Sequence, residues 1–186
     1  MLDWGNMRDR FESGLTFQEM LSTVRTNEEL WTAVYDRATV PDSLVEAVES
    51  LGGPWHLLAL SEDWCGDAVN LLPVLERLAE RAGNLDLRIL SRDDNPDLMD
   101  AYLTGGTSRS IPVVILLDGD FEEQDWWGPR PSPLQHWVRG EGLSLESPER
   151  YRHIRRYYAR DKGRTFLTEI VDMIAGAYDG QAVTSR

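Results

Sequence analysis

Cys65 is the single cysteine among the 186 residues and the side chain best suited to covalent chemistry. It follows an apolar run, Trp55 to Leu60, that predicts a buried strand, and it precedes residues 66–82, which predict a long helix. A thiolate at a helix start faces backbone N–H groups and the positive end of the helix dipole. Such placement lowers a thiol pKa from about 8.5 to roughly 3.5–7.5. We therefore expect a reactive thiol, opposed by the Asp67 carboxylate if that group lies close.

A lone thiolate can attack a disulfide and form a mixed disulfide, but an outside thiol must then release it. One cysteine allows no intramolecular disulfide, so the fold must depend on its core. The same count excludes a zinc site built from cysteines alone, and His56, His136 and His153 lack metal-ligand spacing. We predict no metal.

Other catalytic classes lack their motifs. Gly52-Gly53 and Gly105-Gly106 do not have the spacing of a phosphate-binding loop, and no Gly-x-Ser-x-Gly elbow occurs. His56 precedes the strand that leads to Cys65, so it should lie at the opposite end of that strand. A cysteine–histidine hydrolase is therefore not expected.

The composition also restricts the partners. A formal charge of -13, from 19 basic and 32 acidic residues, repels phosphate backbones and predicts no nucleic-acid binding. The longest apolar runs, such as Val113 to Leu117, are too short to span a bilayer. The N-terminus does not have the pattern of a secretory signal, so we expect a cytoplasmic location and no membrane partner.

The first fifty residues read as helices. Thr16 with Glu19, and Thr26 with Glu29, each match the capping box, in which two backbone donors at a helix start are satisfied reciprocally. We therefore expect a helix to begin after each threonine.

A strand–helix–strand pattern surrounds Cys65 and continues beyond it. Residues 85–89 alternate as a second strand, Asn95-Pro96 begins a short helix through Tyr102, and Pro112 to Leu117 is a buried strand. Asp118-Gly119 predicts a hairpin to a return strand at Phe121 to Trp127. The first pair of strands should be parallel and the last pair antiparallel, which gives a mixed sheet with helices on both faces.

The C-terminal third reads as helical. Ser132-Pro133 and Ser147-Pro148 are both cap-then-proline helix starts, and the last helix covers about 164–178. A stripe of apolar side chains at helical spacing is expected to pack on the core, and it consists of Tyr151, Ile154, Tyr157 and Tyr158.

Several of these residues carry a resemblance to a known family. Trp64-Cys65-Gly66-Asp67-Ala68 resembles the Trp-Cys-Gly-Pro-Cys motif of thioredoxins, and Ile111-Pro112 resembles their Ile-Pro pair, whose proline is cis. Pro73 matches the proline that kinks the family's active-site helix, and Asp118-Gly119 matches its last turn. The resemblance covers about residues 54–128 and the C-terminal helix.

The resemblance implies an α/β thioredoxin-like fold with a mixed sheet of four, or five, strands flanked by helices. We expect an N-terminal helical extension at 1–53 packed on the core and a thioredoxin-like domain at 54–178. That domain carries a helical insertion at about 131–161, and a tail follows at 179–186.

The chain more closely resembles a bacterial branch of uncharacterised thioredoxin-like proteins with an N-terminal helical extension. That branch carries an Asp-Trp-Cys-Gly-Asp motif, a Gly-Pro-Arg-Pro turn and a late Asp-Lys-Gly-Arg segment. Here these are Asp63 to Asp67, Gly128 to Pro131, and Asp161 to Arg164.

Two departures from the family matter. The position of the family's resolving cysteine holds Ala68, and the position of its buried acid holds Ala59. The first change removes the intramolecular disulfide. The second removes the usual proton acceptor for the resolving thiol, so the two losses are consistent with each other.

The family's site maps onto this sequence with Cys65 as the reacting residue. The resemblance places Arg130 beside the cysteine, where it would offset Asp67; the alternative is a hydrogen bond from Arg130 to a nearby carbonyl. It also makes Trp64 and Trp127 the walls of a groove, and the equal alternative is that Trp126 and Trp127 are one core and one surface residue on alternating strand faces. The Ile111 backbone beside Pro112 would pair with an extended peptide or with glutathione. Binding residues are therefore expected in three segments, and they are Trp64, Gly66, Asp67, Ile111, Pro112, Trp127 and Arg130.

Two functions remain open at this point, and both place the chemistry or the binding at Cys65. The first is monothiol thiol–disulfide exchange with glutathione or a protein, without a resident cofactor. The second is a catalytically degenerate module that binds a protein partner. A third idea, an iron–sulfur cluster shared by two chains and glutathione as in monothiol glutaredoxins, lacks the Cys-Gly-Phe-Ser motif.

Overall fold

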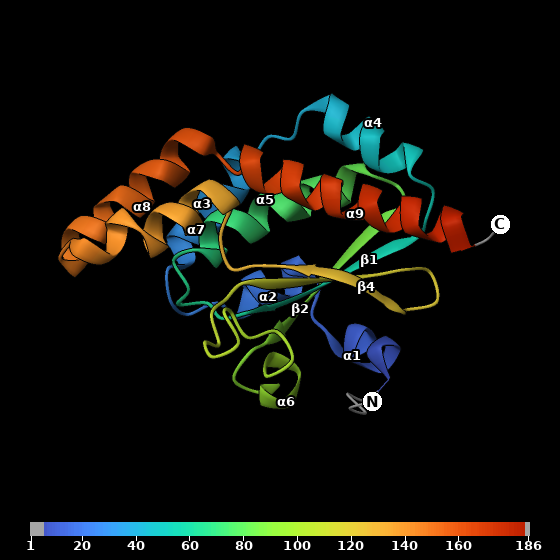
Figure 1. The fold of residues 1–186 in the computed structure, drawn as a ribbon, viewed down its shortest axis with the longest axis horizontal. Helices are drawn as coiled ribbons and strands as arrows, with labels where there is room; N and C mark the ends of the chain where they lie inside the picture. The colour runs from blue at the N-terminus through green and yellow to red at the C-terminus, as the bar shows by residue number, and fades with distance from the viewer. Residues whose placement is uncertain (1–5, 185–186) are drawn as a thin grey trace.

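The computed structural model describes residues 6–184, and side chains through residue 181 (Figure 1). Helices and strands alternate in the middle of the chain, with helices alone at both ends. The elements are α1 (Met7–Ser13), α2 (Phe17–Thr23), α3 (Glu28–Arg37), α4 (Asp42–Ser50), β1 (Trp55–Ser61), α5 (Ala68–Arg81), β2 (Leu85–Ser91), α6 (Pro96–Met99), β3 (Val113–Leu117), β4 (Glu123–Trp127), α7 (Ser132–Arg139), a short 3-10 turn (Glu141–Ser144), α8 (Ser147–Asp161) and α9 (Arg164–Thr184).

Among the described residues the sheet has four strands in the order β2-β1-β3-β4. β1 pairs with β2 in parallel, and the other two pairings are antiparallel. The predicted mixed sheet and its final hairpin are confirmed. The outer edge of β2 meets the N-terminal segment at one antiparallel bridge, where Leu15 and Ile89 exchange backbone hydrogen bonds of 2.9 and 2.8 Å.

Helices cover both faces of the sheet, as expected. Figure 1 shows α4, α5 and α9 on one face and α1 and α6 on the other, with α7 and α8 beyond one end of the sheet. The central strands β1 and β3 are therefore buried on both sides, which explains their continuous apolar sequences. In α5, Leu71, Leu75 and Leu78 are fully buried at helical spacing.

The two predicted capping boxes have different outcomes. Thr16 forms its box with Glu19, so this prediction is confirmed. The box at Thr26 is wrong, because α3 begins one residue later with Asn27 as its N-cap in a left-handed conformation and without a side-chain cap. Thr26 instead donates its backbone N–H to Asp63, 3.0 Å away.

Asp63 ties this N-terminal segment to the loop that carries Cys65. Its carboxylate accepts the backbone N–H groups of Arg25 and Thr26, at 2.9 and 3.0 Å, and its carbonyl accepts the indole N–H of Trp31 at 3.0 Å. The backbone N–H of Arg25 is the main reason that the pKa of Asp63 lies below its usual range.

The C-terminal helices differ in detail from the sequence prediction. α7 and α8 begin with the predicted serines inside the first turn, because Pro131 and Glu146 occupy the N-cap positions. α9 continues to Thr184, so residues 179–184 belong to the helix and were wrongly predicted as part of a tail. Residues 185–186 of that predicted tail lie outside the described residues. No helix within residues 6–184 has the length and apolar character needed to cross a membrane.

Candidate functional site

Cys65 lies in the short loop between β1 and α5, three residues before the helix begins. Its Sγ accepts the backbone N–H of Ala68 at 3.4 Å and lies 3.4 Å from the Ile111 carbonyl oxygen, to which the thiol donates. The peptide bond between Ile111 and Pro112 is cis. The predicted arrangement, with the sulfur at the helix start facing a cis-proline, is therefore present.

The Cys65 thiol is buried, with 5% of the residue exposed. Burial raises the pKa of this thiol above its ordinary value, and the Asp67 carboxylate raises it further, whereas the Ala68 N–H and the Arg130 guanidinium act in the opposite direction. The expected lowering of this pKa is wrong, because the cost of desolvating a thiolate outweighs the helix N-terminus.

Asp67 stands at the centre of a buried polar cluster beside the sulfur. One of its carboxylate oxygens accepts the Tyr158 hydroxyl at 2.7 Å, and the other pairs with the Arg130 guanidinium at 2.6 Å. Burial and the Asp67 charge raise the pKa of Tyr158, so this phenol stays protonated and donates to the carboxylate. Arg130 therefore compensates Asp67 directly, and the thiol lies beside a neutralised pair.

Tyr158 is the residue that sequence reasoning missed as part of the site. It was predicted to belong to a packing stripe, and its ring is buried as expected. Its hydroxyl, however, donates a hydrogen bond to the Asp67 carboxylate. The signal was the spacing of Tyr151, Ile154 and Tyr158, which puts all three on one side of α8, and that side faces the pocket.

The Gly128-Pro129-Arg130-Pro131 turn brings Arg130 to this cluster. A Cβ on Gly128 would lie 2.5 Å from the Pro112 carbonyl oxygen, so only glycine allows β4 to end this close to the cis-proline segment. The Gly128–Pro129 bond is also cis. Pro131 then caps α7. The close approach at Gly128 thus places the Arg130 side chain next to the Asp67 carboxylate.

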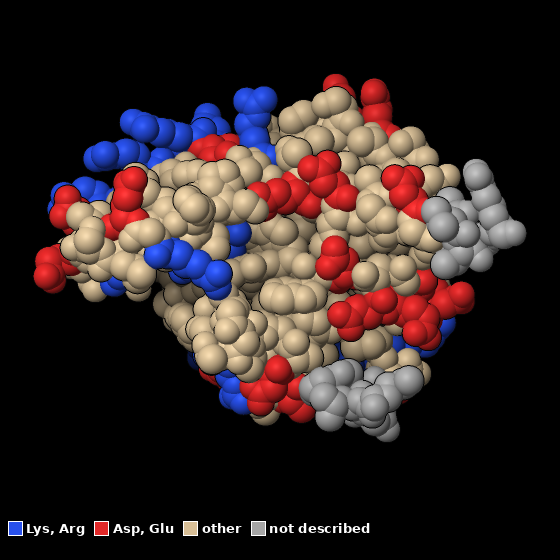
Figure 2. Space-filling view, in the orientation of Figure 1, with Lys and Arg blue, Asp and Glu red and all other residues tan. Residues whose placement is uncertain are grey.

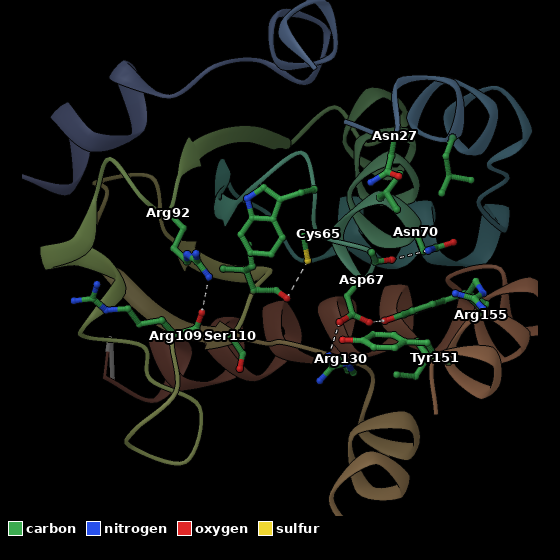
Figure 3. Close-up of a pocket in the computed structure, with 17 residues that line it drawn as sticks. Asn27, Cys65, Asp67, Asn70, Arg92, Arg109, Ser110, Arg130, Tyr151 and Arg155 are labelled. Carbon is green, nitrogen blue, oxygen red and sulfur yellow. Dashed lines mark hydrogen bonds and ion pairs between the residues drawn. The ribbon is translucent and has the colours of Figure 1, made fainter. Parts of the chain in front are cut away.

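Cys65 forms part of the floor of a pocket of about 600 Å³ (Figure 3). One side is formed by Trp64, Arg92 and residues 109–111, and the other by Asn70 and α8. The Trp64 side chain is 48% exposed, and the Arg92 guanidinium lies 5.0 Å from the centre of its ring. The pocket is therefore an aromatic and cationic hollow with a single sulfur in it.

The structure brings some of the predicted binding residues to the pocket and excludes others. Among the residues that line it are Trp64, Cys65, Gly66, Asp67, Ile111 and Arg130. Pro112 is buried and is not among the residues that line the pocket.

Trp127 is not a wall of the pocket, and that expectation is wrong. Its indole N–H donates to Glu169 on α9 at 2.7 Å, and its ring packs on Phe166 with centres 4.5 Å apart. Its neighbour Trp126 contacts Tyr102 instead, because successive side chains of a strand point to opposite faces. The far wall of the pocket comes from Tyr151 and its neighbours on α8.

The two alanines that replace family residues are both fully buried. Ala68 begins α5 beside the sulfur, and Ala59 lies in the middle of β1. Among residues 6–184, His, Cys, Asp and Glu do not gather in a group of three or more that could hold a metal ion. The groups of the pocket that could take part in chemistry are therefore the Cys65 thiol and the adjacent cluster of Asp67, Arg130 and Tyr158.

A family model described as thioredoxin matches residues 14–150. The chain belongs to the thioredoxin family. The match begins in the N-terminal helical segment and ends inside α8, so it includes Cys65, the cis-proline and the Arg130 turn.

Solved structures agree with this thioredoxin-family assignment at the level of the fold. A protein of unknown function from Pseudomonas aeruginosa superposes with a TM-score of 0.76 at 20% identity, over 93% of this chain and 99% of that one. An HIV epitope scaffold superposes with a TM-score of 0.73 at 19% identity, over 92% and 99%. No curated protein sequence matches the chain.

Proposed function

We propose that this thioredoxin-family protein captures a partner's sulfur through Cys65 by monothiol exchange. The observation that carries the proposal is the position of Sγ on the pocket floor, between the Ala68 N–H and the Ile111 carbonyl. A disulfide that enters the pocket beside Ile111 meets this sulfur, and the N–H stabilises negative charge on it during the exchange.

The exchange conserves electrons and requires one proton to leave. Cys65 loses its proton to solvent, and the thiolate attacks one sulfur of the partner disulfide. A bond forms between Cys65 and that sulfur, the partner's own S–S bond breaks, and the second sulfur departs as a thiolate that takes up a proton. An outside thiol such as glutathione later attacks the mixed disulfide and releases Cys65.

The raised pKa of Cys65 favours retention over turnover. Exchange expels the sulfur with the lower thiol pKa faster, so a high-pKa Cys65 is a poor leaving group. Ala68 occupies the position from which a second cysteine would displace the partner. The captured partner is then held until external thiols act, and the reducing cytoplasm supplies such thiols.

The first test is the dependence of Cys65 alkylation on pH, measured with iodoacetamide on the native protein. We expect a midpoint above about 8.5, the value for a free thiol. Asp67→Asn should lower this midpoint, because it removes a negative charge and leaves the Arg130 charge in place. Asp86→Asn, at the other end of the sheet, is the matched control and should leave the midpoint unchanged.

The second test is adduct formation with glutathione disulfide at about pH 9, followed by intact mass. We expect one glutathionyl group on the native protein and none on Cys65→Ser. A native protein that remains unmodified while its Cys65 is alkylated normally at this pH would overturn the proposal.

Non-covalent binding of a protein partner is the second candidate. The observation in its favour is Trp64, an aromatic side chain that is 48% exposed at the rim of the pocket and carries Arg92 over its ring. Complementation of a deletion strain separates the two candidates. A Cys65→Ser protein that restores function while Trp64→Ala does not would favour binding over exchange.

A further inference from the structure

The charge of this chain is distributed unevenly around the pocket. Residues 139–164 hold eight of the 19 basic residues and only four of the 32 acidic ones, so this segment is basic within a protein of formal charge -13. Figure 2 shows the basic side chains gathered at the α8 end of the molecule, and acidic side chains over α9 and the β3–β4 hairpin.

The exposed arginines of α8 are not neutralised by the rest of the chain. Among residues 6–184 they form no ion pair of the kind that holds Arg130, and they are Arg152, Arg155, Arg156 and Arg160. Arg155 is exposed and also lines the pocket. The free positive charge of this helix therefore reaches the rim of the site.

Cations lie on both sides of the sulfur. Figure 3 shows Arg92 and Arg109 on one side of Cys65 and Arg155 on the other. Arg92 and Arg109 pair with carboxylates that are about half exposed and lie outside the pocket lining. Of the described residues that line the pocket, Asp67 is the one carboxylate, and Arg130 already compensates it.

We propose that this pocket selects a polypeptide whose cysteine is flanked on both sides by acidic residues. The inference rests on the proposed function, because Cys65 makes the covalent bond, and it names the class of partner. An acidic segment laid across the pocket places carboxylates against Arg92 and Arg109 on one side and against Arg155 on the other. A nucleic acid is disfavoured, because a long polyanion would extend from this basic end over strongly acidic surface.

The test compares peptides that each carry one cysteine activated as a disulfide with the same aryl thiol. Cys65 attacks the peptide sulfur, the mixed disulfide forms, and the aryl thiolate that leaves is followed by its absorbance. Acidic flanks are compared with neutral flanks at about pH 9, because the fraction of Cys65 thiolate rises with pH and its pKa is raised. We expect the acidic peptide to react about tenfold faster at low ionic strength. This advantage should largely disappear at about 0.5 M salt.

Arginine variants locate the effect. Arg155→Gln should reduce the ratio of the acidic-peptide rate to the neutral-peptide rate about threefold. Arg37→Gln is the matched control, because Arg37 is an exposed arginine at the end of α3 remote from the pocket, and it should change neither rate.

Failure of the inference and failure of the proposed function give different results. A neutral peptide that reacts, together with an acidic peptide that reacts no faster, overturns the inference alone. A neutral peptide that reacts no faster than with Cys65→Ser overturns the proposed function and the inference with it. As competitors of the acidic-peptide reaction, an oligonucleotide and a cysteine-free acidic peptide of equal charge are compared. Equal inhibition by the two would show general polyanion binding and overturn the choice of polypeptide.

Discussion

Gly163→Ala is expected to destabilise the protein through two effects that the structure separates. Gly163 joins α8 to α9 with φ +78°, in the left-handed region that L residues rarely adopt. A Cβ at this position would lie 2.9–3.1 Å from three side-chain atoms of Val74. Val74 is buried in α5 with 2% of its surface exposed, so it has no free space into which to move.

The two contributions set the magnitude. A left-handed conformation costs a non-glycine residue about 1–2 kcal/mol, and overpacking a well-filled core costs about 1–3 kcal/mol more. Gly163→Ala should therefore lower the free energy of unfolding by about 2–5 kcal/mol. Gly106→Ala is the matched control, since Gly106 has φ +75° but no heavy atom within 4 Å of its added Cβ. Gly106→Ala should lower the free energy of unfolding only by the backbone contribution of about 1–2 kcal/mol.

Urea unfolding followed by tryptophan fluorescence and by far-ultraviolet circular dichroism measures both values. Agreement of the two probes supports the two-state treatment that the free energies require. Equal losses for Gly163→Ala and Gly106→Ala would refute the reasoning, because contact with Val74 would then contribute nothing.

Three further predictions concern single side chains. Burial, together with the Glu80 charge, raises the pKa of Glu76 to about 7, so the folded state binds the extra proton and stability falls as pH rises from about 4.5 through 7. Glu76→Gln should then stabilise the protein by about 1–2 kcal/mol at pH 8 and little at pH 5, as thermal melts at both pH values would show. Asp63→Ala, which removes the acceptor of two backbone N–H groups, should cost about 1–2 kcal/mol in urea unfolding, with Asp63→Asn costing less. Thr16→Ala should cost about 1 kcal/mol by the same measurement, whereas Thr26→Ala, which caps no helix, should cost less than half of that.

The sequence predicts the fold well where the signal is local. The apolar run of β1, the alternation in β2 and the Asp118-Gly119 turn each depend on neighbouring residues, and the strands and the final hairpin follow from them. Thr26 shows the limit of local patterns. It has the spacing of a capping box, but its backbone N–H is used by Asp63, a residue 37 positions away.

The candidate site was predictable in its backbone and less so in its side chains. The sulfur, the cis-proline and the Arg130 turn follow from short motifs that resemble the family. The Tyr158–Asp67 hydrogen bond joins residues 91 positions apart, and no local pattern indicates it. The direction of the Cys65 pKa shift was predicted wrongly because the helix start is visible in the sequence, whereas the depth of burial depends on packing.

The Asp67 cluster makes the site depend on segments that a minimal thioredoxin-like core would omit. Residues 54–128 contain the sheet and Cys65, but Arg130 and Tyr158, the two partners of Asp67, lie beyond them. A fragment limited to that core would leave Asp67 without either of its partners, as an uncompensated negative charge two residues from the sulfur. Ionisation of the thiol in the intact protein therefore reports whether the segment that carries Arg130 and Tyr158 has docked on Asp67, and the alkylation rate of Cys65 can serve as a probe of that docking.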